Sequence, residues 1–426
     1  MIKRRFLLLM VFMLSSIPVL PMVYDNRILP LVQKPFISIP DCDSHFHLDA
    51  VFMTGKTAFG PDVMRPEVSI PEIFGTFDQG DLGRAMTAAG LTSPMPPEWV
   101  TGRFPWGMFS KIQAEGISFY GQFTLADRWS IGFSAMALWL VSRLDFALTQ
   151  PTNPPLPTEE DRLDLDTLRR VMFDELGITS GYAKQSGMGD LDLYVRYGSW
   201  ADYIYKMRRI EAGLRFGALF PTGVRRNPDN PSSVPFGGDG HYGIYAQGDA
   251  DFEFKEDWTF GLWFRVIKRF SRDQIMRLQV LNEQLLFGVE RACVNVDPGV
   301  TFVGLPYVYF ENIREGLGLG LQYTVISHLA DSFAQFVSGD RIDLDYTVEQ
   351  NPTGEGNTTK STPLHELSSW SSEYVTLNIF YDFGKMKDER NFSPIVSVTW
   401  DIPVSALVAE KSAKLYNISL GVEFTF

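Results

Sequence analysis

Two histidines and two aspartates alternate over a short stretch near the N-terminus and form a candidate metal-binding set. They are Asp43, His45, His47 and Asp49. Histidines at positions i and i+2 bind zinc when a third ligand converges on them. The same spacing puts four polar side chains on one face of an extended strand, where they need only be hydrated. Because one strand supplies one side of a site, we favour the second interpretation and predict no metal and no cofactor.

Charged residues recur at every second position of several later segments. Facing rows of opposite charge inside a lumen create a transverse field, which orients polar solutes and sets ion preference. Alternatively, such charges pair between strands and only fill a narrow interior. Both statements can hold together, and we interpret the charges as lining a pore. They are Asp190, Asp192, Arg196, Glu211, Arg215, Asp249, Asp251, Glu253, Arg265 and Glu423.

The segments that carry these charges alternate between apolar and polar residues. In the last one, apolar side chains occupy every second position from Tyr416 to Phe426, and polar ones lie between them. A period of two over this length predicts a strand with one apolar side. About twelve such segments have the roughly ten residues that a tilted strand needs to cross a bilayer. They lie near 43–54, 108–126, 129–147, 187–198, 206–221, 238–255, 258–270, 296–311, 316–329, 371–384, 392–403 and 412–426.

The connections between these segments favour a membrane barrel over a soluble sandwich. Short joins, such as Asp127–Arg128 and Glu256–Asp257, alternate with long ones. A transmembrane barrel has short periplasmic turns, long external loops and an even number of strands, whereas a sandwich has no reason to place its long loops at one end. We therefore predict an all-β fold: a single transmembrane, antiparallel, up-and-down β-barrel of about twelve strands over 43–426.

The long connections are predicted to be external or infolded loops of mostly irregular structure, with a short amphipathic helix over 158–177. The aromatic-rich loop 55–107 either folds inward as a constriction or caps the barrel from outside. Within 108–126 the apolar phase changes near Gly116, which predicts a β-bulge there. The loops are 55–107, 148–186, 271–295 and 330–370.

The N-terminus carries an export signal. Lys3, Arg4 and Arg5 precede the apolar run Phe6–Leu14, which predicts a signal peptide over 1–24. Residues 25–42 then form a periplasmic segment before the first strand. Cys42 and Cys293 are too few for a disulfide framework, and the predicted topology places them near opposite ends of the barrel.

Composition supports a β-rich exported protein and excludes one class of partner. The 426 residues include 36 glycines and 33 phenylalanines, of which glycine weakens helices and phenylalanine favours sheets. The formal net charge is −13. Nucleic acid is excluded as a partner, because phosphate binding needs a basic face.

Catalysis is not predicted. An esterase would need a nucleophilic serine within reach of a histidine. Outer-membrane phospholipases, which are twelve-stranded barrels, use a His-x-Ser-Asn-Gly context, and none of the five histidines stands in it. The glycine-rich run Gly237–Gly240 precedes no strand-to-helix unit, so we interpret it as the start of a strand.

Two stretches resemble a known group of outer-membrane proteins. The run from Gly187 to Tyr197, Gly-Met-Gly-Asp-Leu-Asp-Leu with Arg196-Tyr197, is similar to a strand of porin-like proteins linked to aromatic degradation. Leu214–Gly217, continuing to Pro221-Thr222-Gly223, matches the next strand of that group. The group is related to the long-chain fatty-acid transporters, which have fourteen strands and an N-terminal plug with an Asn-Pro-Ala motif that is missing here.

The resemblance implies passive diffusion of small, hydrophobic or aromatic solutes through a porin-like channel in the bacterial outer membrane. It also implies that Phe426 is the final aromatic residue that the barrel assembly machinery recognises. The expected partners are outer-membrane lipid, that machinery and a small-molecule solute. The alternative is a closed structural or adhesion barrel that binds a partner through its external loops.

Overall fold

The computed structural model leaves the predicted signal peptide, Cys42, Asp43 and Phe426 outside the residues it describes. No helix in the described part of the chain is long and apolar enough to cross a membrane. The described residues are 26–30, 44–62, 65–126, 128–149, 151–155, 159–179, 181–203, 207–255, 257–337, 340–350, 357–386 and 393–425.

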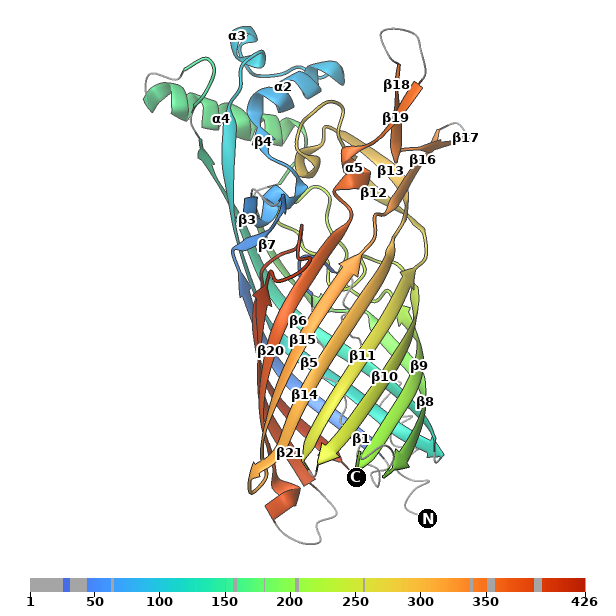
Figure 1. Ribbon diagram of the computed structural model, residues 1–426. Coiled ribbons are helices and arrows are strands. Elements are labelled where there is room, and N and C mark those ends of the chain that lie inside the picture. The colour runs from blue at the N-terminus through green and yellow to red at the C-terminus, as the bar shows by residue number, and fades with distance from the viewer. Residues whose placement is uncertain are drawn as a thin grey trace.

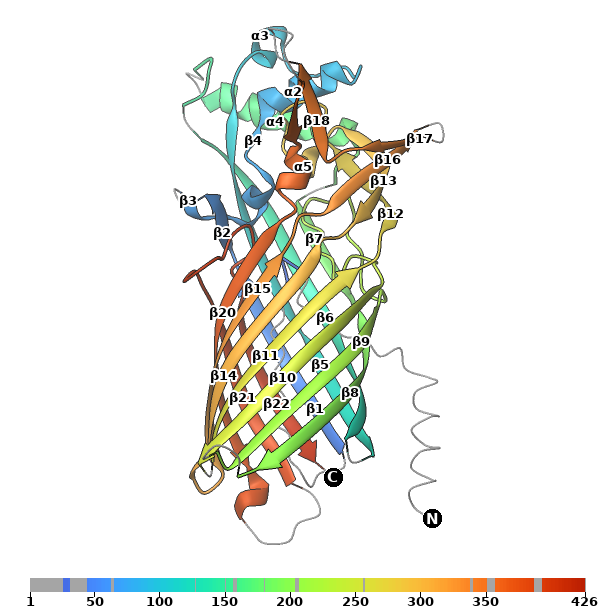
Figure 2. The same ribbon diagram turned by 45° about the vertical axis from the view of Figure 1, so that its right-hand side comes forward.

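Twelve antiparallel strands close into a tilted barrel (Figures 1 and 2). Each strand pairs with its neighbours along the chain, and the first pairs with the last, from His45 opposite Thr425 to Thr54 opposite Tyr416. The predicted fold class is confirmed. The strands are β1 (Ser44–Gly55), β5 (Pro105–Ala126), β6 (Trp129–Leu148), β8 (Leu191–Asp202), β9 (Arg209–Phe220), β10 (Gly243–Lys255), β11 (Trp258–Arg269), β14 (Val300–Arg314), β15 (Leu317–His328), β20 (Trp370–Asp382), β21 (Ser393–Val404) and β22 (Tyr416–Thr425).

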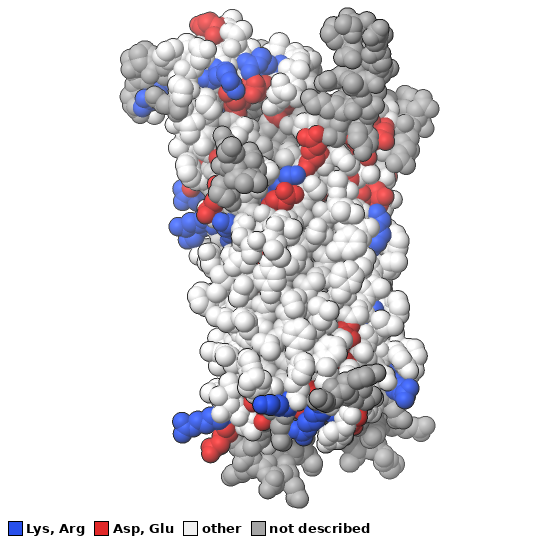
Figure 3. Space-filling view, in the orientation of Figure 1, with Lys and Arg blue, Asp and Glu red and all other residues white. Residues whose placement is uncertain are grey.

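The outer face of the barrel is apolar around its middle. On β22, Ile418 and Leu420 are 48% and 51% exposed, whereas Ser419 between them is 5% exposed. Figure 3 shows an uncharged belt with charged side chains gathered above and below it. A closed barrel without free edges and with such a belt satisfies the requirements of a bilayer. The chain is an outer-membrane β-barrel, as predicted.

The long connections at one end of the barrel are more ordered than predicted. In the described residues they form four α-helices, a four-stranded sheet and two hairpins, because each connection has enough residues to pair or pack above the strands. The helix predicted over 158–177 is confirmed as α4. These elements are β2 (Thr57–Asp62), β3 (Arg65–Ser69), η1 (Ile70–Phe74), β4 (Phe77–Asp78), α2 (Gln79–Ala88), α3 (Pro97–Val100), α4 (Glu159–Glu175), β7 (Tyr182–Met188), β12 (Arg272–Leu278), η2 (Leu285–Phe287), β13 (Glu290–Asp297), β16 (Ser332–Val337), β17 (Asp340–Asp343), β18 (Tyr346–Gln350), β19 (Asn357–Ser361) and α5 (Pro363–Glu366); η3 (Phe383–Met386) lies at the opposite end.

Loop 55–107 both enters the mouth of the barrel and covers it. Its η1 turn is buried through Ile73 and Phe74, and its helix α2 is buried through Leu82 and Met86. These side chains belong to one apolar core with inward residues of β5 and β6 and with α4. The two alternatives left open by the sequence therefore describe different parts of the same loop.

Strand β5 has no bulge near Gly116, so that prediction was wrong. Gly116 pairs in unbroken register with Val51 and Leu138. Above this level Ile112 points inward and is buried while Lys111 is exposed; below it Ile117 points outward and is 42% exposed. The apolar face changes because the upper strand has water outside and the capped core inside, whereas the lower strand has lipid outside.

The N-terminal segment also departs from the prediction where it is described. Residues 26–30 lie at the end with the long connections, opposite to the end where Ser44 begins β1. The Arg27 carbonyl accepts a hydrogen bond from the Ala413 amide at 2.9 Å, just before β22, and Ile28 and Leu29 join the apolar core. Burial of these two apolar side chains stabilises the position. This part of 25–42 therefore lies at the end with the long connections and not at the end where β1 begins, and its position relative to the periplasm stays a prediction.

The lipid-facing assignment of β22 is testable by substitution. Leu420→Arg places a guanidinium against lipid at the centre of the strand and should lower the free energy of unfolding by about 2–4 kcal/mol. Leu407→Arg, in the connection before β22 where Leu407 is 74% exposed, should change it by less than about 0.5 kcal/mol. Urea unfolding of the protein in lipid vesicles measures both values, and equal effects would contradict the assignment.

Candidate functional site

A buried carboxylate lies at the break between β7 and β8. Both strands pair with β6, and Gly189 and Asp190 leave the sheet between them. Asp190 is fully buried and pairs with Arg269 of β11, with 2.7 Å between Oδ2 and Nη2. The amides of Gly238 and Gly223 donate to its two oxygens at 2.7 and 3.3 Å. Asp190 thus joins two points of the single β9–β10 connection to β11, which lies on the far side of β9 and β10.

Glycine is required where the loops approach this carboxylate. A Cβ atom on Gly237, whose φ is +94°, would lie 2.5 Å from Asp190 Cγ. A Cβ on Gly223 would lie 1.9 Å from the Phe236 carbonyl oxygen. The glycine-rich run predicted to begin a strand is therefore a turn that wraps the ion pair, and β10 begins three residues after it, at Gly243.

The two stretches that resemble the porin-like group contact each other at this place. The Thr222 hydroxyl donates to the Gly189 carbonyl at 3.0 Å, next to the Gly223–Asp190 contact. One stretch supplies the carboxylate and the other supplies part of its hydrogen-bonding shell. Sequence reasoning missed Arg269, because the arginine belongs to neither stretch.

Below Asp190, predicted luminal residues form a connected network across β8, β10 and β11. Arg265 is fully buried, and its Nε and Nη2 donate to Gln247 Oε1 at 3.0 and 2.8 Å. Its guanidinium lies 4.1 Å from the centre of the Tyr245 ring. The Tyr245 hydroxyl donates to Asp192 at 2.8 Å. Arginine, tyrosine and aspartate thereby fill the interior at this level.

The network continues toward the short-turn end. Arg196 pairs with Asp249 at 2.6 Å and with Glu211 at 3.1 Å, so three strands share one cation. Arg215 lies 4.0 Å from the centre of the Tyr194 ring. Asp251 accepts a hydrogen bond from the Tyr307 hydroxyl, and Glu253 pairs with Arg208 at 3.5 Å. The nine predicted residues from 190 to 265 thus lie along one wall, and their role as a pore lining stays a prediction.

Glu423 stands apart from that wall, on β22. Its carboxylate lies 3.4 Å from His45 Nδ1 and 3.5 Å from His47 Nδ1, and His47 Nε2 lies 2.9 Å from Asp49. The His47 ring stacks on Tyr120 with 4.5 Å between ring centres. Among the described residues no group of three potential ligands has the geometry to hold a metal ion.

His328 and Asp331 form part of a linear set with Thr301. The Thr301 hydroxyl lies 2.7 Å from His328 Nδ1, and His328 Nε2 lies 2.8 Å from Asp331. The ring nitrogens are used in the reverse order from a serine-hydrolase triad, in which the aspartate holds Nδ1. Thr301 is 1% exposed and does not line the adjacent cavity. The set ties the upper ends of β14 and β15 to the loop that follows.

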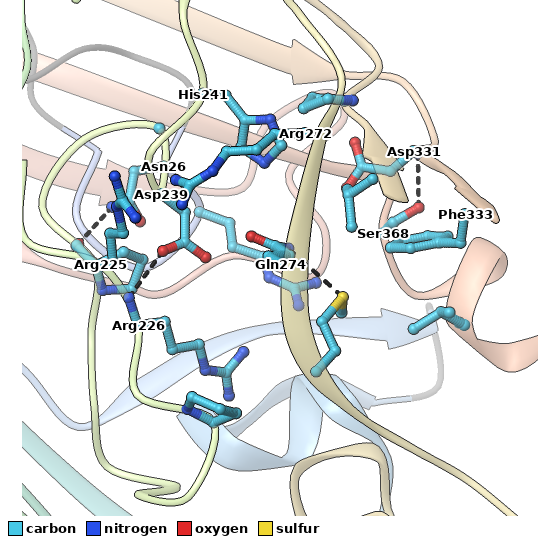
Figure 4. Close-up of a pocket in the computed structure, with 18 of the residues that line it drawn as sticks. Asn26, Arg225, Arg226, Asp239, His241, Arg272, Gln274, Asp331, Phe333 and Ser368 are labelled. Atoms are coloured by element: carbon cyan, nitrogen blue, oxygen red, sulfur yellow. Dashed lines mark hydrogen bonds between the residues drawn. The ribbon is translucent and has the colours of Figure 1, made fainter. Parts of the chain in front are cut away.

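A cavity of about 510 Å³ lies above the luminal network, among the long connections (Figure 4). Its floor consists of Arg269, His328 and Trp370, which stand at the upper ends of β11, β15 and β20. Its walls come from residues 26–28, the 225–241 loop and the β12–β13 hairpin. The sequence did not indicate this cavity, because no local pattern relates these distant segments.

One wall of the cavity is cationic, and the other is apolar. Arg27 and Arg226 lie over the same ring, with guanidinium carbons 4.0 and 5.0 Å from the centre of Phe74. Burial and, to a smaller extent, the nearby charge of Arg226 together lower the pKa of Arg27 to about 9. Burial also lowers the pKa of Arg226. The apolar wall includes Leu285, Leu286, Phe333 and Leu364, and it continues into Trp370 of the floor.

Comparison with known proteins gives only distant likenesses. No protein-family model and no curated protein matches the chain. Among solved structures, the COG4313 outer membrane channel from Pseudomonas putida F1 is 11% identical, with a TM-score of 0.44 over 93% of this chain and 100% of that one. The Pseudomonas putida toluene transporter TodX is 10% identical, with a TM-score of 0.31 over 91% and 90%.

The transport unit of the autotransporter AIDA-I from Escherichia coli is 7% identical, with a TM-score of 0.33 over 95% of each chain. All these structures are similar to the chain at a level that adds nothing to the fold shown by the strand pairing.

The Asp190–Arg269 pair should dominate the stability of the upper barrel. Asp190→Asn keeps the side-chain shape but removes one charge of the buried pair, which costs about 3–5 kcal/mol. Asp145→Asn is the matched control, because its pair with Arg143 at 2.9 Å is exposed on the outer face and contributes about 0–1 kcal/mol. Urea unfolding in lipid vesicles should give a larger loss in the free energy of unfolding for Asp190→Asn than for Asp145→Asn. Similar losses would show that the buried pair stabilises the barrel no more than the exposed pair does.

Proposed function

We propose that this barrel is an outer-membrane channel for passive diffusion of small, hydrophobic or aromatic solutes. The observation that carries the proposal is the position of the 510 Å³ cavity, whose floor is the upper layer of the lumen. Its volume lies in the range of about 300–1,000 Å³ typical of small-molecule sites. A solute that enters from the loop end would bind there before it meets the strands.

Beneath the cavity, the charged network would act as the selective part of the path. Arg269 lines the cavity floor and pairs with Asp190, and Asp192 and Arg265 follow one layer below. Passage through this level requires the side chains to move, because Arg265 and Asp192 are 0% and 1% exposed. The same charges would then determine which ions accompany the solute.

The close packing of this network is the observation that favours the alternative function. If the side chains never separate, the barrel is a closed scaffold, and the helices and hairpins above it would bind a partner. The two functions differ in one measurable property, the transport of a small solute across a sealed membrane.

Transport can be tested with the purified chain in planar bilayers and liposomes. We expect single-channel steps and uptake of benzyl alcohol into liposomes. Combined replacement of Arg196, Arg215 and Arg265 by glutamine should lower the anion-to-cation permeability ratio. Removing one charge about 4 Å from the ion changes its energy by at least about 1 kcal/mol, roughly a fivefold effect.

Arg143→Gln is the control, because Arg143 lies on the outer face with its side chain 66% exposed. It should leave the permeability ratio unchanged. Absence of both conductance and uptake in the wild-type protein would contradict the channel and support the closed scaffold. Conductance that the triple variant does not alter would exclude these arginines from the path.

A further inference from the structure

We propose that the cavity is a binding site for small organic acids, in which a carboxylate binds the arginines and an apolar body rests on the opposite wall. This inference rests on the proposed channel function for the step from binding to uptake. It narrows the solute from hydrophobic molecules in general to amphipathic monoanions.

The charge of the cavity is opposite to that of the chain. The chain has a net charge of −13. The cavity lining contains six arginines and three aspartates, and two of the arginines pair with aspartates outside the lining, which leaves an excess of one positive charge. The arginines are Arg27, Arg225, Arg226, Arg269, Arg272 and Arg277.

Only two of the six arginines are neutralised by a carboxylate. Arg269 pairs with Asp190, and Arg277 pairs with Asp229 at 2.8 Å. The described part of the chain places no acidic side chain within ion-pair distance of the other four, which are Arg27, Arg225, Arg226 and Arg272.

The three aspartates of the lining are engaged elsewhere. Asp331 binds His328 at 2.8 Å, and Asp273 accepts a hydrogen bond from the Asn295 side chain at 2.7 Å. Asp239 accepts from the backbone amide of Arg226 at 2.8 Å rather than from its guanidinium. None of the three forms an ion pair with an arginine of the cationic wall in the described residues, and the charges of Asp331 and Asp239 act on Arg27 and Arg226 only at longer range.

Arg27 and Arg226 converge from segments far apart in the sequence. The Arg27 guanidinium donates to the Leu367 carbonyl at 2.6 Å and shares the Phe74 ring with Arg226. Both arginines are half-buried, and the charge of Arg226 lowers the pKa of Arg27. Like charges that act on each other in this way are unfavourable unless an opposite charge joins them. A carboxylate that reaches both would supply that charge.

Arg225 and Arg272 form a second cationic position around Gly240. The Arg272 guanidinium donates to the Gly240 carbonyl at 3.0 Å. A Cβ atom on Gly240, whose φ is +90°, would lie 1.9 Å from Arg272 Nη1 and 2.9 Å from Arg225 Nε. Only glycine lets both side chains approach this turn. Guanidinium groups bind carboxylates through two parallel hydrogen bonds, which suits such a paired arrangement.

The opposite wall selects for an organic body on the anion. Leu285, Leu286, Phe333, Leu364 and Trp370 present aliphatic and aromatic surface to the same space. An inorganic anion would leave this surface in contact with water, and a neutral hydrocarbon would leave four arginines without a counter-ion. An acid with an aromatic or aliphatic body satisfies both walls.

Binding can be tested with one acid and its neutral analogue. Isothermal titration of the full chain in lipid nanodiscs, with 4-phenylbutyrate and 4-phenylbutanol, should give roughly tenfold tighter binding of the acid. Added salt should weaken the binding of 4-phenylbutyrate and leave the binding of 4-phenylbutanol unchanged. Arg27→Gln combined with Arg226→Gln should abolish the preference, Arg272→Gln should reduce it, and Arg143→Gln should leave it unchanged.

The outcomes separate the site from the channel. Equal binding of acid and alcohol to the wild-type protein, without salt dependence, would overturn the anion site whether or not the variants fold. Inorganic phosphate that competes as well as the acid would overturn the role of the apolar wall. Liposome uptake of both compounds without a preference would leave the channel standing and reject the site. Selective binding of the acid without liposome uptake of either compound would support the site and reject the channel.

Discussion

The buried ion pair between Asp190 and Arg269 connects the two parts of the molecule that a solute would meet. It lies where the sheet breaks between β7 and β8, and the connection between β9 and β10 wraps it through Gly223 and Gly238. Arg269 belongs to the cavity floor, whereas Asp192, two residues beyond Asp190, belongs to the luminal network. A buried charge tolerates little displacement, so cavity and lumen are held in one fixed relation.

The barrel has two levels around this pair. The lower level is apolar outside and polar inside, whereas the upper level is polar outside and apolar inside. In the lower level lipid requires apolar side chains outside, and the polar groups crowd into the lumen, where they pair. In the upper level water surrounds the strands, and the interior is an apolar core shared with η1, α2 and α4. Strand β5 passes through both levels and pairs with β6 in unbroken register from Trp106 to Thr124, and only its side-chain chemistry changes.

Much of the lower level was predictable, because period-two alternation is a local property of each strand. It gave the twelve strands, the lipid-facing residues such as Leu420 and the inward charges such as Arg265. The upper level was not, because its features depend on contacts between distant segments. Arg27, Arg226 and Arg272 form no pattern in the sequence, and Gly237–Gly240 reads as a turn only once Asp190 is beside it. The bulge predicted near Gly116 was wrong for the same reason. The sequence shows that the apolar face of β5 changes there, but it does not show that the change follows from the boundary between water and lipid outside the barrel.

That boundary also sets how deep the protein sits in its membrane. Lys111 and Arg143 lie directly opposite each other on β5 and β6, with Lys184 on β7 nearby, all facing outward just above the apolar belt. Moving them into hydrocarbon would be costly, so the belt has a defined height. A thicker bilayer would have to thin around the barrel, and a thinner one would make it tilt. Bilayer thickness would thereby act on the orientation of the cavity relative to the cell surface.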